Sequence, residues 1–242
     1  MLFKQLFKMK TISIVLCTFN EANYIEETIK LIYKTLNDVE LIIVDDNSND
    51  RTIEIINNLK SDYDFKFFVR KNERGLASAQ KKGFEESSGD YVGTIDVNSR
   101  DQILYFPDLK SKLDSGYDLA VLSRYVKGGD DERVFLRSFA SKAINIVSKL
   151  VLRIPFNDFT SGIFLSKRNL LIKFKNIITG YSEWFIEYVY LARKKNFKLV
   201  EIPYVQKKDE ALIESKSYPN IFTFLYLGFT YLMRIFLTVL RN

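Results

Sequence analysis

The sequence predicts an α/β fold with a mainly parallel central sheet in one large domain. Two observations carry this prediction: short apolar runs alternate with helical stretches, and polar residues follow the runs. Strands that alternate with helices form βαβ units with right-handed crossovers. The predicted strands are residues 12–17, 40–44, 65–69, 91–95 and 117–122. The predicted helices between them are residues 21–36, 52–60, 76–86 and 103–113, where apolar residues recur at helical spacing.

The second half of the chain alternates less regularly. We expect a helix over residues 134–152, a polar loop over 156–162 and an amphipathic helix over 182–195. Residues 197–202 are typical of a strand that Pro203 ends, and the charged stretch 206–217 is a candidate mobile loop. A length of 242 residues fits one large domain, or one domain with an appendage.

The composition excludes several kinds of site. The chain has no histidine and a single cysteine, Cys17, which excludes an internal disulfide and makes a structural zinc site unexpected. A metal ion would be a hard cation held by oxygen ligands, and acid–base chemistry would fall to carboxylates or be unnecessary. The net charge of +6 suits a polyanionic ligand or an anionic membrane surface. The basic residues are dispersed along the chain, which disfavours a nucleic-acid partner.

Polar residues follow four of the predicted strands. In parallel sheets of this kind, ligands bind beyond the carboxyl ends of the strands. Any one of these groups alone could be a turn or a helix cap, but four together predict a convergent site. The groups are residues 18–21, 45–50, 96–98 and 123–125.

Eight short motifs carry a resemblance to a known family. They occupy residues 17–21 (CTFNE), 44–50 (VDDNSND), 74–79 (RGLASA), 88–92 (SGDYV), 96–98 (DVN), 123–129 (SRYVKGG), 158–162 (DFTSG) and 214–216 (ESK). In this order they resemble the inverting glycosyltransferases of family 2, and specifically the dolichol-phosphate mannosyltransferase and polyprenyl-phosphate glycosyltransferase group. The resemblance covers most of the chain and implies a Rossmann-like catalytic domain of the GT-A fold.

The resemblance implies where a nucleotide sugar would bind. Thr18, Asn20, Glu21, Asp45 and Asp46 would line the nucleotide pocket, because carboxylates accept hydrogen bonds from base N–H groups and ribose hydroxyls.

The resemblance also implies a divalent metal ion beside the diphosphate. Asp96 would bind both the nucleotide and a magnesium or manganese ion, and Asn98 would be a second metal ligand. Asn98 stands where the family has aspartate, and Arg100 stands where a neutral residue is common, so we expect weaker metal binding than in the family.

The resemblance further implies a site for an acceptor phosphate, made by Arg124, Arg137, Ser141 and Lys216. Arg137 and Ser141 are four residues apart and lie on one face of the predicted helix. With Asp96, the first three are the expected catalytic residues. An acceptor phosphate is already an anion, so its attack needs no base and only positive charge that positions two phosphates. Asp158, Thr160 and Ser161 would shape the acceptor side; a structural role is equally consistent with the sequence.

The two ends of the chain suggest contact with a membrane. Residues 1–10 form a basic amphipathic lead-in, 11–217 the catalytic domain, and 218–242 a membrane-associating helix. Residues 221–240 are long enough to cross a bilayer, yet their polar residues fall on one helical stripe: Thr223, Thr230, Arg234, Thr238 and Arg241. This pattern favours a helix in the membrane plane over a spanning helix or a helix packed on the domain. The expected location is the cytoplasmic face of a membrane.

These features predict an inverting transferase that moves a sugar, mannose favoured and so GDP-mannose as donor, to a polyprenyl phosphate. A UDP-sugar transferase of the glucose type, acting on the same or another acceptor, is the first alternative. A non-catalytic GT-A scaffold is the second, supported by Asn98 and Arg100 and opposed by the complete set of phosphate-binding residues.

Overall fold

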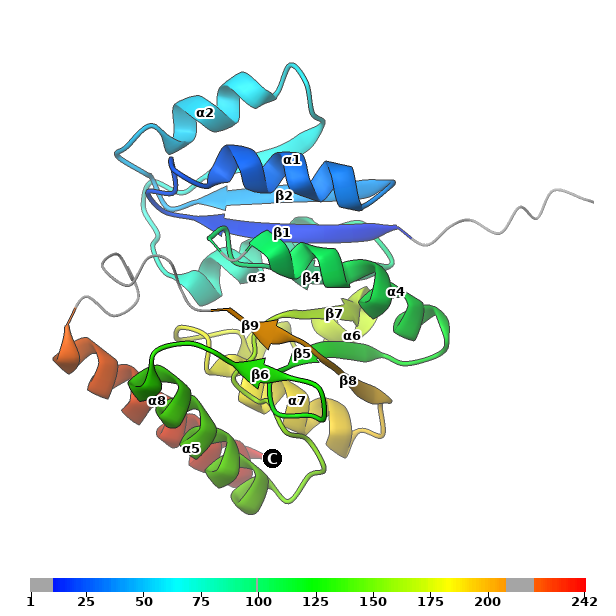
Figure 1. The fold of residues 1–242 in the computed structure, drawn as a ribbon, viewed down its shortest axis with the longest axis vertical. Coiled ribbons are helices and arrows are strands. Elements are labelled where there is room, and N and C mark those ends of the chain that lie inside the picture. Colours follow the sequence, from blue (N-terminus) through cyan, green and yellow to red (C-terminus); the bar gives the residue numbers. More distant parts are fainter. Residues whose placement is uncertain (1–10, 99, 208–219) are drawn as a thin grey trace, which may run out of the picture.

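The computed structural model describes residues 11–98, 100–207 and 220–242 (Figure 1). The predicted lead-in over residues 1–10 and Lys216 lie outside the described residues, as does most of the candidate loop over 206–217. For Arg100, the backbone alone is described.

A seven-stranded sheet forms the centre of the molecule, in the order β3-β2-β1-β4-β7-β5-β8. Neighbouring strands are parallel except β7, which is antiparallel to both β4 and β5. A two-stranded parallel ribbon, β6-β9, lies beside it. The strands are β1 (Ile12–Thr18), β2 (Val39–Asp45), β3 (Phe65–Val69), β4 (Tyr91–Thr94), β5 (Leu119–Ser123), β6 (Asp130–Asp131), β7 (Phe164–Lys167), β8 (Leu199–Pro203) and β9 (Val205–Gln206).

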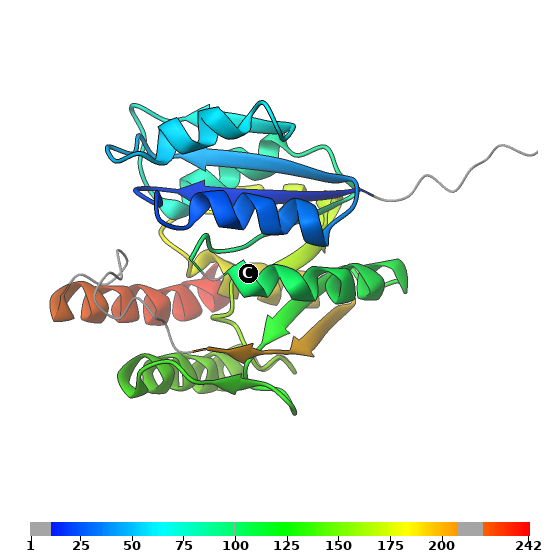
Figure 2. The ribbon, with the colours of Figure 1, turned by 45° about the horizontal axis from the view of Figure 1, so that its top comes forward.

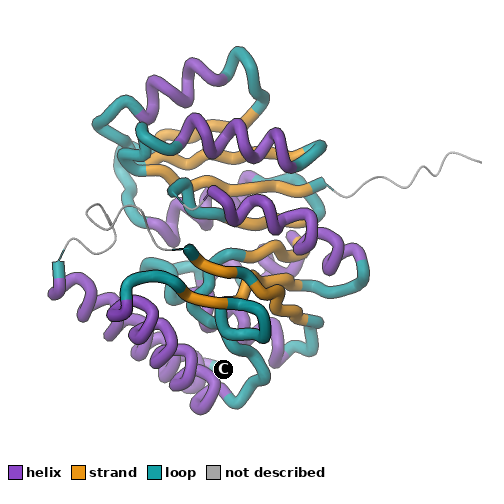
Figure 3. Tube along the Cα trace, viewed as in Figure 1, coloured by secondary structure: helices purple, strands orange, loops and turns teal. Residues whose placement is uncertain are grey.

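Helices cover both faces of the sheet, as Figure 3 shows. Alternate residues of β1 divide between two hydrophobic clusters: Ile14 and Leu16 pack with α1, α2 and α4, whereas Val15 packs with α3, α6 and α7. The helices are α1 (Ile25–Thr35), α2 (Thr52–Leu59), α3 (Leu76–Glu86), α4 (Phe106–Asp114), α5 (Phe135–Leu152), α6 (Arg168–Lys173), α7 (Trp184–Lys194) and α8 (Ile221–Arg241), with short 3-10 helices η1 (Arg100–Tyr105) and η2 (Lys175–Ile177).

The predicted α/β class and the mainly parallel sheet are confirmed, and several elements differ from the expectations, among them the short elements β6, β9, α6 and η2, which were not predicted. The helix expected over 103–113 is split into η1 and α4, because Pro107 lies in the first turn of α4, where its missing N–H costs nothing. The helix expected from residue 21 begins at Ile25, because the preceding residues form a loop in which the Glu21 amide donates to Thr52 Oγ1. Strand β7 was not predicted. It is four residues long and buried on both faces, so it has no alternating pattern.

The C-terminal helix α8 packs along α5 and α7 with part of its polar stripe facing inward (Figures 1 and 2). Arg234 is buried, with Nη1 2.9 Å from Glu187 Oε2 and Nη2 donating to the Thr179 carbonyl at 2.7 Å. Thr238 is also buried, whereas Thr223 and Thr230 are half-buried and Arg241 is exposed. Helix α8 therefore packs on the domain. Its polar stripe was predicted to lie at the membrane surface, but Arg234 of this stripe faces the protein and pairs with Glu187.

The opposite side of α8 is exposed and apolar. Helix α8 is the one helix among the described residues that is long and apolar enough to cross a membrane. Helix α5 lies beside it (Figure 2). Large apolar side chains of α5 are exposed as well. We call this surface the α5–α8 face; its exposed residues are Phe135, Leu136, Phe139, Ile146, Leu150, Phe222, Leu225, Tyr226, Phe229, Leu232, Met233, Phe236, Val239 and Leu240.

Candidate active site

The loops that follow β1 and β2 are joined through one buried carboxylate. Asp45 ends β2 and is fully buried. Its Oδ2 accepts from Thr18 Oγ1 at 2.7 Å and from Ser48 Oγ at 2.6 Å, and its Oδ1 accepts from the Ser48 amide at 2.8 Å. Both Asp45 and Thr18 were predicted to contact a nucleotide. The structure places them beneath the pocket, where they hold the two loops in register.

Asn20 and Glu21 add further hydrogen bonds between the loop after β1 and the segment after β2. The Asn20 amide donates to Ser48 Oγ at 2.9 Å, and Asn20 Oδ1 accepts from the Asn49 amide at 3.0 Å. Asn20 adopts a φ of 56°, a left-handed conformation that asparagine tolerates better than most residues. The Glu21 amide donates to Thr52 Oγ1 at 2.7 Å. Four of the five residues predicted in the first two loops, Thr18, Asn20, Glu21 and Asp45, are therefore together at one edge of the sheet.

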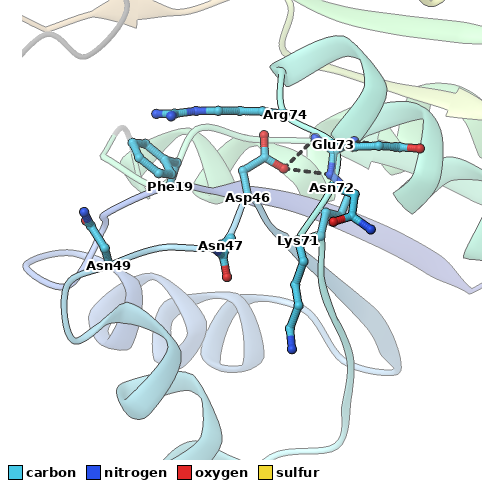
Figure 4. A pocket seen from close by; sticks show the side chains of 9 residues that line it. Phe19, Asp46, Asn47, Asn49, Lys71, Asn72, Glu73 and Arg74 are labelled. Carbon is cyan, nitrogen blue, oxygen red and sulfur yellow. Dashed lines mark hydrogen bonds and ion pairs between the residues drawn. The ribbon is translucent and has the colours of Figure 1, made fainter.

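Asp46 is held from the other side by the segment that follows β3. Arg70 Nε donates to Asp46 Oδ1 at 2.7 Å, and the Gly75 amide donates to Asp46 Oδ2 at 2.7 Å (Figure 4 labels Asp46). Gly75 has a φ of 131°, which side-chain-bearing residues rarely adopt, and this conformation lies at the N-cap of α3. Sequence reasoning missed Arg70, which follows a strand directly, as the predicted groups do.

These segments surround a hollow of about 410 Å³ at the carboxyl edge of β1 and β2. The Arg74 guanidinium lies 3.8 Å from the centre of the Phe19 ring. Figure 4 shows these two side chains near each other. An aromatic ring, amides and cations are groups that a nucleotide base, ribose and phosphate would contact. The lining residues are Phe19, Asp46, Asn47, Asn49, Arg70, Lys71, Asn72, Glu73 and Arg74. Among them, sequence reasoning assigned only Asp46, although Phe19 and Arg74 lie inside the motifs it used.

The predicted metal ligands Asp96 and Asn98 follow β4 and are exposed. Burial and the negative charges of Asp46 and Asp96 raise the pKa of the Cys17 thiol, against the opposing charge of Arg70. Asp96 therefore lies close to the same end of β1 as the nucleotide hollow. Among the described residues, no group of three or more acidic, histidine or cysteine side chains could hold a metal. Asp96 and Asn98 offer hard oxygen ligands, so they fit a magnesium- or manganese-type ion whose remaining ligands come from a diphosphate and water.

On the other half of the sheet edge, Arg124 is paired with Asp158 inside the protein. Nε donates to Asp158 Oδ2 at 2.8 Å and Nη2 donates to Oδ1 at 2.7 Å, while the Arg124 amide donates to Oδ2 at 2.9 Å. Nη2 also donates to Thr160 Oγ1 at 2.8 Å. Burial opposes the charge of Arg124, but Asp158 raises its pKa well above the usual range. Gly129 allows the loop to fold back, since a Cβ there would lie 2.5 Å from the Ser123 carbonyl oxygen.

Arg137 and Ser141 lie one turn apart on α5, as the sequence predicted, and both are half-buried. Ser141 Oγ accepts a hydrogen bond from Arg133 Nη2 at 3.0 Å. Arg133 in turn pairs with Asp131 through two contacts of 2.7 Å. Sequence reasoning missed both Asp131 and Arg133, which lie between two recognised motifs. Ser161, also expected on this side, accepts from the Ile163 amide at 3.4 Å.

The fold is of the Rossmann-like α/β class, with a hollow at the carboxyl edge of β1 and β2 and a cluster of arginines on the other half of the sheet edge. The model of the family "Glycosyl transferase family 2" matches residues 13–175 of the chain. The chain therefore belongs to glycosyltransferase family 2, as its motifs predicted.

The chain is similar to two curated relatives and to one solved structure. The chain is 32% identical over 214 residues to the dolichol-phosphate mannosyltransferase of Pyrococcus furiosus, covering 85% of this chain and 60% of that protein. It is 26% identical over 202 residues to the glycosyltransferase AglD of Haloferax volcanii, covering 79% of this chain and 32% of that protein. The chain thus spans three fifths of the first relative and about a third of the second.

The solved structure is the glucosyl-3-phosphoglycerate synthase of Mycobacterium tuberculosis in complex with Mn²⁺, UDP and phosphoglyceric acid. The TM-score is 0.72 at 18% identity, with 95% of this chain and 78% of that chain covered. The same enzyme is also known with Mg²⁺ and UDP. At this identity the likeness shows the fold alone, and it confirms the predicted GT-A fold.

Proposed function

We propose that the chain transfers a hexose, with mannose favoured, from a nucleoside diphosphate sugar to a polyprenyl phosphate at a membrane surface. One observation carries this proposal: the nucleotide hollow, Asp96 with Asn98, and the arginines around Ser141 all lie beyond the carboxyl edge of one sheet. The family relationship supports glycosyl transfer, and the relative from Pyrococcus furiosus supports the mannose donor and the lipid acceptor.

In this mechanism, the hollow around Phe19 and Arg74 binds the nucleotide, and Asp46 limits its position. A divalent ion held in part by Asp96 and Asn98 would stabilise the charge that develops on the departing diphosphate. An acceptor phosphate oxygen forms a bond to the anomeric carbon while the bond to the diphosphate breaks, and the electron pair leaves with the nucleotide. The attacking oxygen carries no proton, so the reaction needs no general base, in keeping with a chain that has no histidine.

The α5–α8 face supports the membrane part of the proposal. Monomeric proteins rarely expose so many large apolar side chains on adjacent helices. The Arg234–Glu187 pair keeps the charged side of α8 against the protein, so the apolar side is the one available to acyl chains. This arrangement favours a helix lying in the membrane plane. Because Arg137 and Ser141 lie on α5, a lipid phosphate at the membrane surface would be close to them.

The experiment is transfer of radiolabelled sugar into organic-extractable lipid. The full chain would be mixed with a short polyprenyl phosphate and, separately, with GDP-mannose or UDP-glucose, each with magnesium, manganese or chelator. We expect labelled lipid from GDP-mannose, and its loss with Asp96→Ala. Asn98→Asp should restore the family's second carboxylate and lower the metal concentration needed. Product from UDP-glucose alone would establish the glucose-type alternative. No product from any donor, with nucleotide binding intact, would overturn the polyprenyl phosphate acceptor and favour another acceptor or the scaffold alternative.

Membrane contact has its own test, flotation with lipid vesicles that contain anionic lipid. We expect the double variant Phe139→Asp and Phe229→Asp, which charges both helices of the α5–α8 face, to lose at least tenfold in vesicle binding. Leu104→Asp is the matched control, because Leu104 is an equally exposed apolar residue on η1. Equal flotation of all three proteins would exclude this face as the membrane contact.

A further inference from the structure

The two arginines of residues 124–134, the loop between β5 and α5, differ in how many hydrogen-bond donors they have left. Arg124 uses Nε and Nη2 on Asp158, and its Nη1 lies 3.4 Å from Gln206 Oε1 and 3.6 Å from Asp131 Oδ2. Its side chain is 2% exposed. A ligand phosphate would therefore have to displace existing partners before it could bind Arg124.

Within the described residues, Arg133 is held by two of its three nitrogens. Nε donates to Asp131 Oδ1 at 2.7 Å, and Nη2 donates to Asp131 Oδ2 at 2.7 Å and to Ser141 Oγ at 3.0 Å. Among the residues that the structure describes, Nη1 of Arg133 has no hydrogen-bond partner. The Arg133 side chain is 10% exposed, so solvent or a ligand can still reach it.

The contact with Arg133 also determines what Ser141 can do. The Ser141 oxygen accepts from Arg133, so its own hydroxyl hydrogen remains available to donate, and within the described part of the chain it has no acceptor. Two N–H groups on Arg133 Nη1 and one O–H on Ser141 therefore lie next to each other. Several donors converging from a guanidinium and a hydroxyl suit the oxygens of a phosphate monoester.

We propose that Arg133 binds the acceptor's phosphate monoester together with Ser141, and that Arg124 is a positioning residue that holds the loop beneath them. This inference rests on the proposed function, since it names the residue that recognises the acceptor of that reaction. Asp131 fixes the guanidinium through a bidentate pair, so little conformational entropy is lost when a phosphate binds. Burial opposes the charge of Asp131, but its contacts with Arg133 and Arg124 lower its pKa to about 2, which keeps the pair ionised at neutral pH.

The test is equilibrium binding of two phosphate monoesters to the full chain: citronellyl phosphate, a short prenyl phosphate, and phosphoglyceric acid, a soluble one. Arg133→Gln should weaken binding of the recognised monoester about tenfold, which corresponds to about 1.4 kcal/mol, without changing nucleotide affinity. Arg133→Lys keeps the charge but presents a single point donor, and should lose roughly threefold. Lys142→Gln, an exposed lysine beside Ser141 on α5, is the matched control and should stay within twofold of the unmodified chain.

The outcomes separate this inference from the proposed function. Prenyl phosphate bound equally by the unmodified chain and by both Arg133 variants would overturn the inference and leave the function standing. Binding of phosphoglyceric acid alone, lost in Arg133→Gln, would overturn the lipid acceptor and support the role of Arg133. Binding of neither monoester would overturn both. A folding defect in Arg133→Gln leaves the Arg133→Lys comparison to decide.

Discussion

The proposed donor side of the sheet edge, around Asp45, and the proposed acceptor side, around Asp158, are each built around a buried aspartate, but the two aspartates have different partners. On the donor side, Asp45 accepts hydrogen bonds from hydroxyl and amide groups of Thr18 and Ser48, which are neutral. On the acceptor side, Asp158 accepts from the guanidinium of Arg124, a full charge that is itself buried. Removing the carboxylate therefore leaves an unpaired charge on one side only.

A second comparison concerns which residues remain available to a ligand. On each side, one motif residue uses its hydrogen bonds to hold loops together: Asp45 on one side and Arg124 on the other. Two other arginines are more open: Arg74 lines the hollow, and Arg133 has a nitrogen without a hydrogen-bond partner among the described residues. We therefore expect Asp45 and Arg124 to hold the loops of the site, and ligand contact to fall to side chains such as Arg74 and Arg133.

The largest effect is expected from Asp158→Asn, which keeps the shape of the side chain and removes its charge. Arg124 would be left buried without its main counter-charge, so we expect the free energy of unfolding to fall by about 3–5 kcal/mol. Urea unfolding followed by circular dichroism would measure it, with the exposed Asp130→Asn as the matched control, expected within about 0.5 kcal/mol of the unmodified chain. A loss below about 1 kcal/mol would show that Asp131, 3.6 Å from Arg124, takes over the pairing.

The next largest effect is a loss of stability at acidic pH that depends on Asp131. Its folded-state pKa is about 2, below the ordinary value of 3.8, so the carboxylate contributes stability above about pH 4 and loses it as pH falls towards 2. The contribution is on the order of 2 kcal/mol at neutral pH, less what solvent screening removes. The difference in unfolding free energy between the unmodified chain and Asp131→Asn should shrink between pH 4 and pH 2. A difference that stays constant over that range would show that Asp131 titrates normally.

A smaller effect is expected from Asp45→Asn, the donor-side counterpart of Asp158→Asn. The hydroxyls of Thr18 and Ser48 can rotate to accept from the new amide, and no buried charge loses its partner, so the expected loss is about 1 kcal/mol. The same urea unfolding experiment would measure it, with the exposed Asp64→Asn as control. A loss equal to that of Asp158→Asn would remove the distinction between the two sides.

The sequence predicted the donor half of the fold well, because its signals are local there. Alternating strands and helices place Asp45, Asp46 and Asp96 at strand ends, and a parallel sheet brings such ends to one edge. Strand β7 escaped prediction because its partners β4 and β5 are defined by long-range pairing, which leaves no periodic pattern in four buried residues. The sequence also did not predict that Arg234 faces the protein, because its partner Glu187 is far away in the chain.

The candidate site was predicted by residue type and place, while the partners of each side chain were not. Arg124 and Asp158 were each recognised, yet nothing in the spacing of two residues 34 positions apart indicates that they pair. Arg133 was not singled out because an arginine beside acidic residues in a loop is an ordinary surface pattern. Its role depends on the half-buried geometry of Asp131 and Ser141, which the fold alone provides.

The smallest effect tests whether Arg74, rather than the frame beneath it, contributes to nucleotide binding. Its guanidinium lies over Phe19 at an exposed position, where such a contact is worth about 0.5–1 kcal/mol. If Arg74 contacts the nucleotide, Arg74→Ala should raise the dissociation constant roughly two- to fivefold, as measured by titration calorimetry, and leave unfolding unchanged. Lys60→Ala is the matched control, because Lys60 lies over Phe67 in the same manner but outside the hollow. Equal nucleotide affinity in both variants would mean that the nucleotide binds without Arg74, through the other residues that line the hollow.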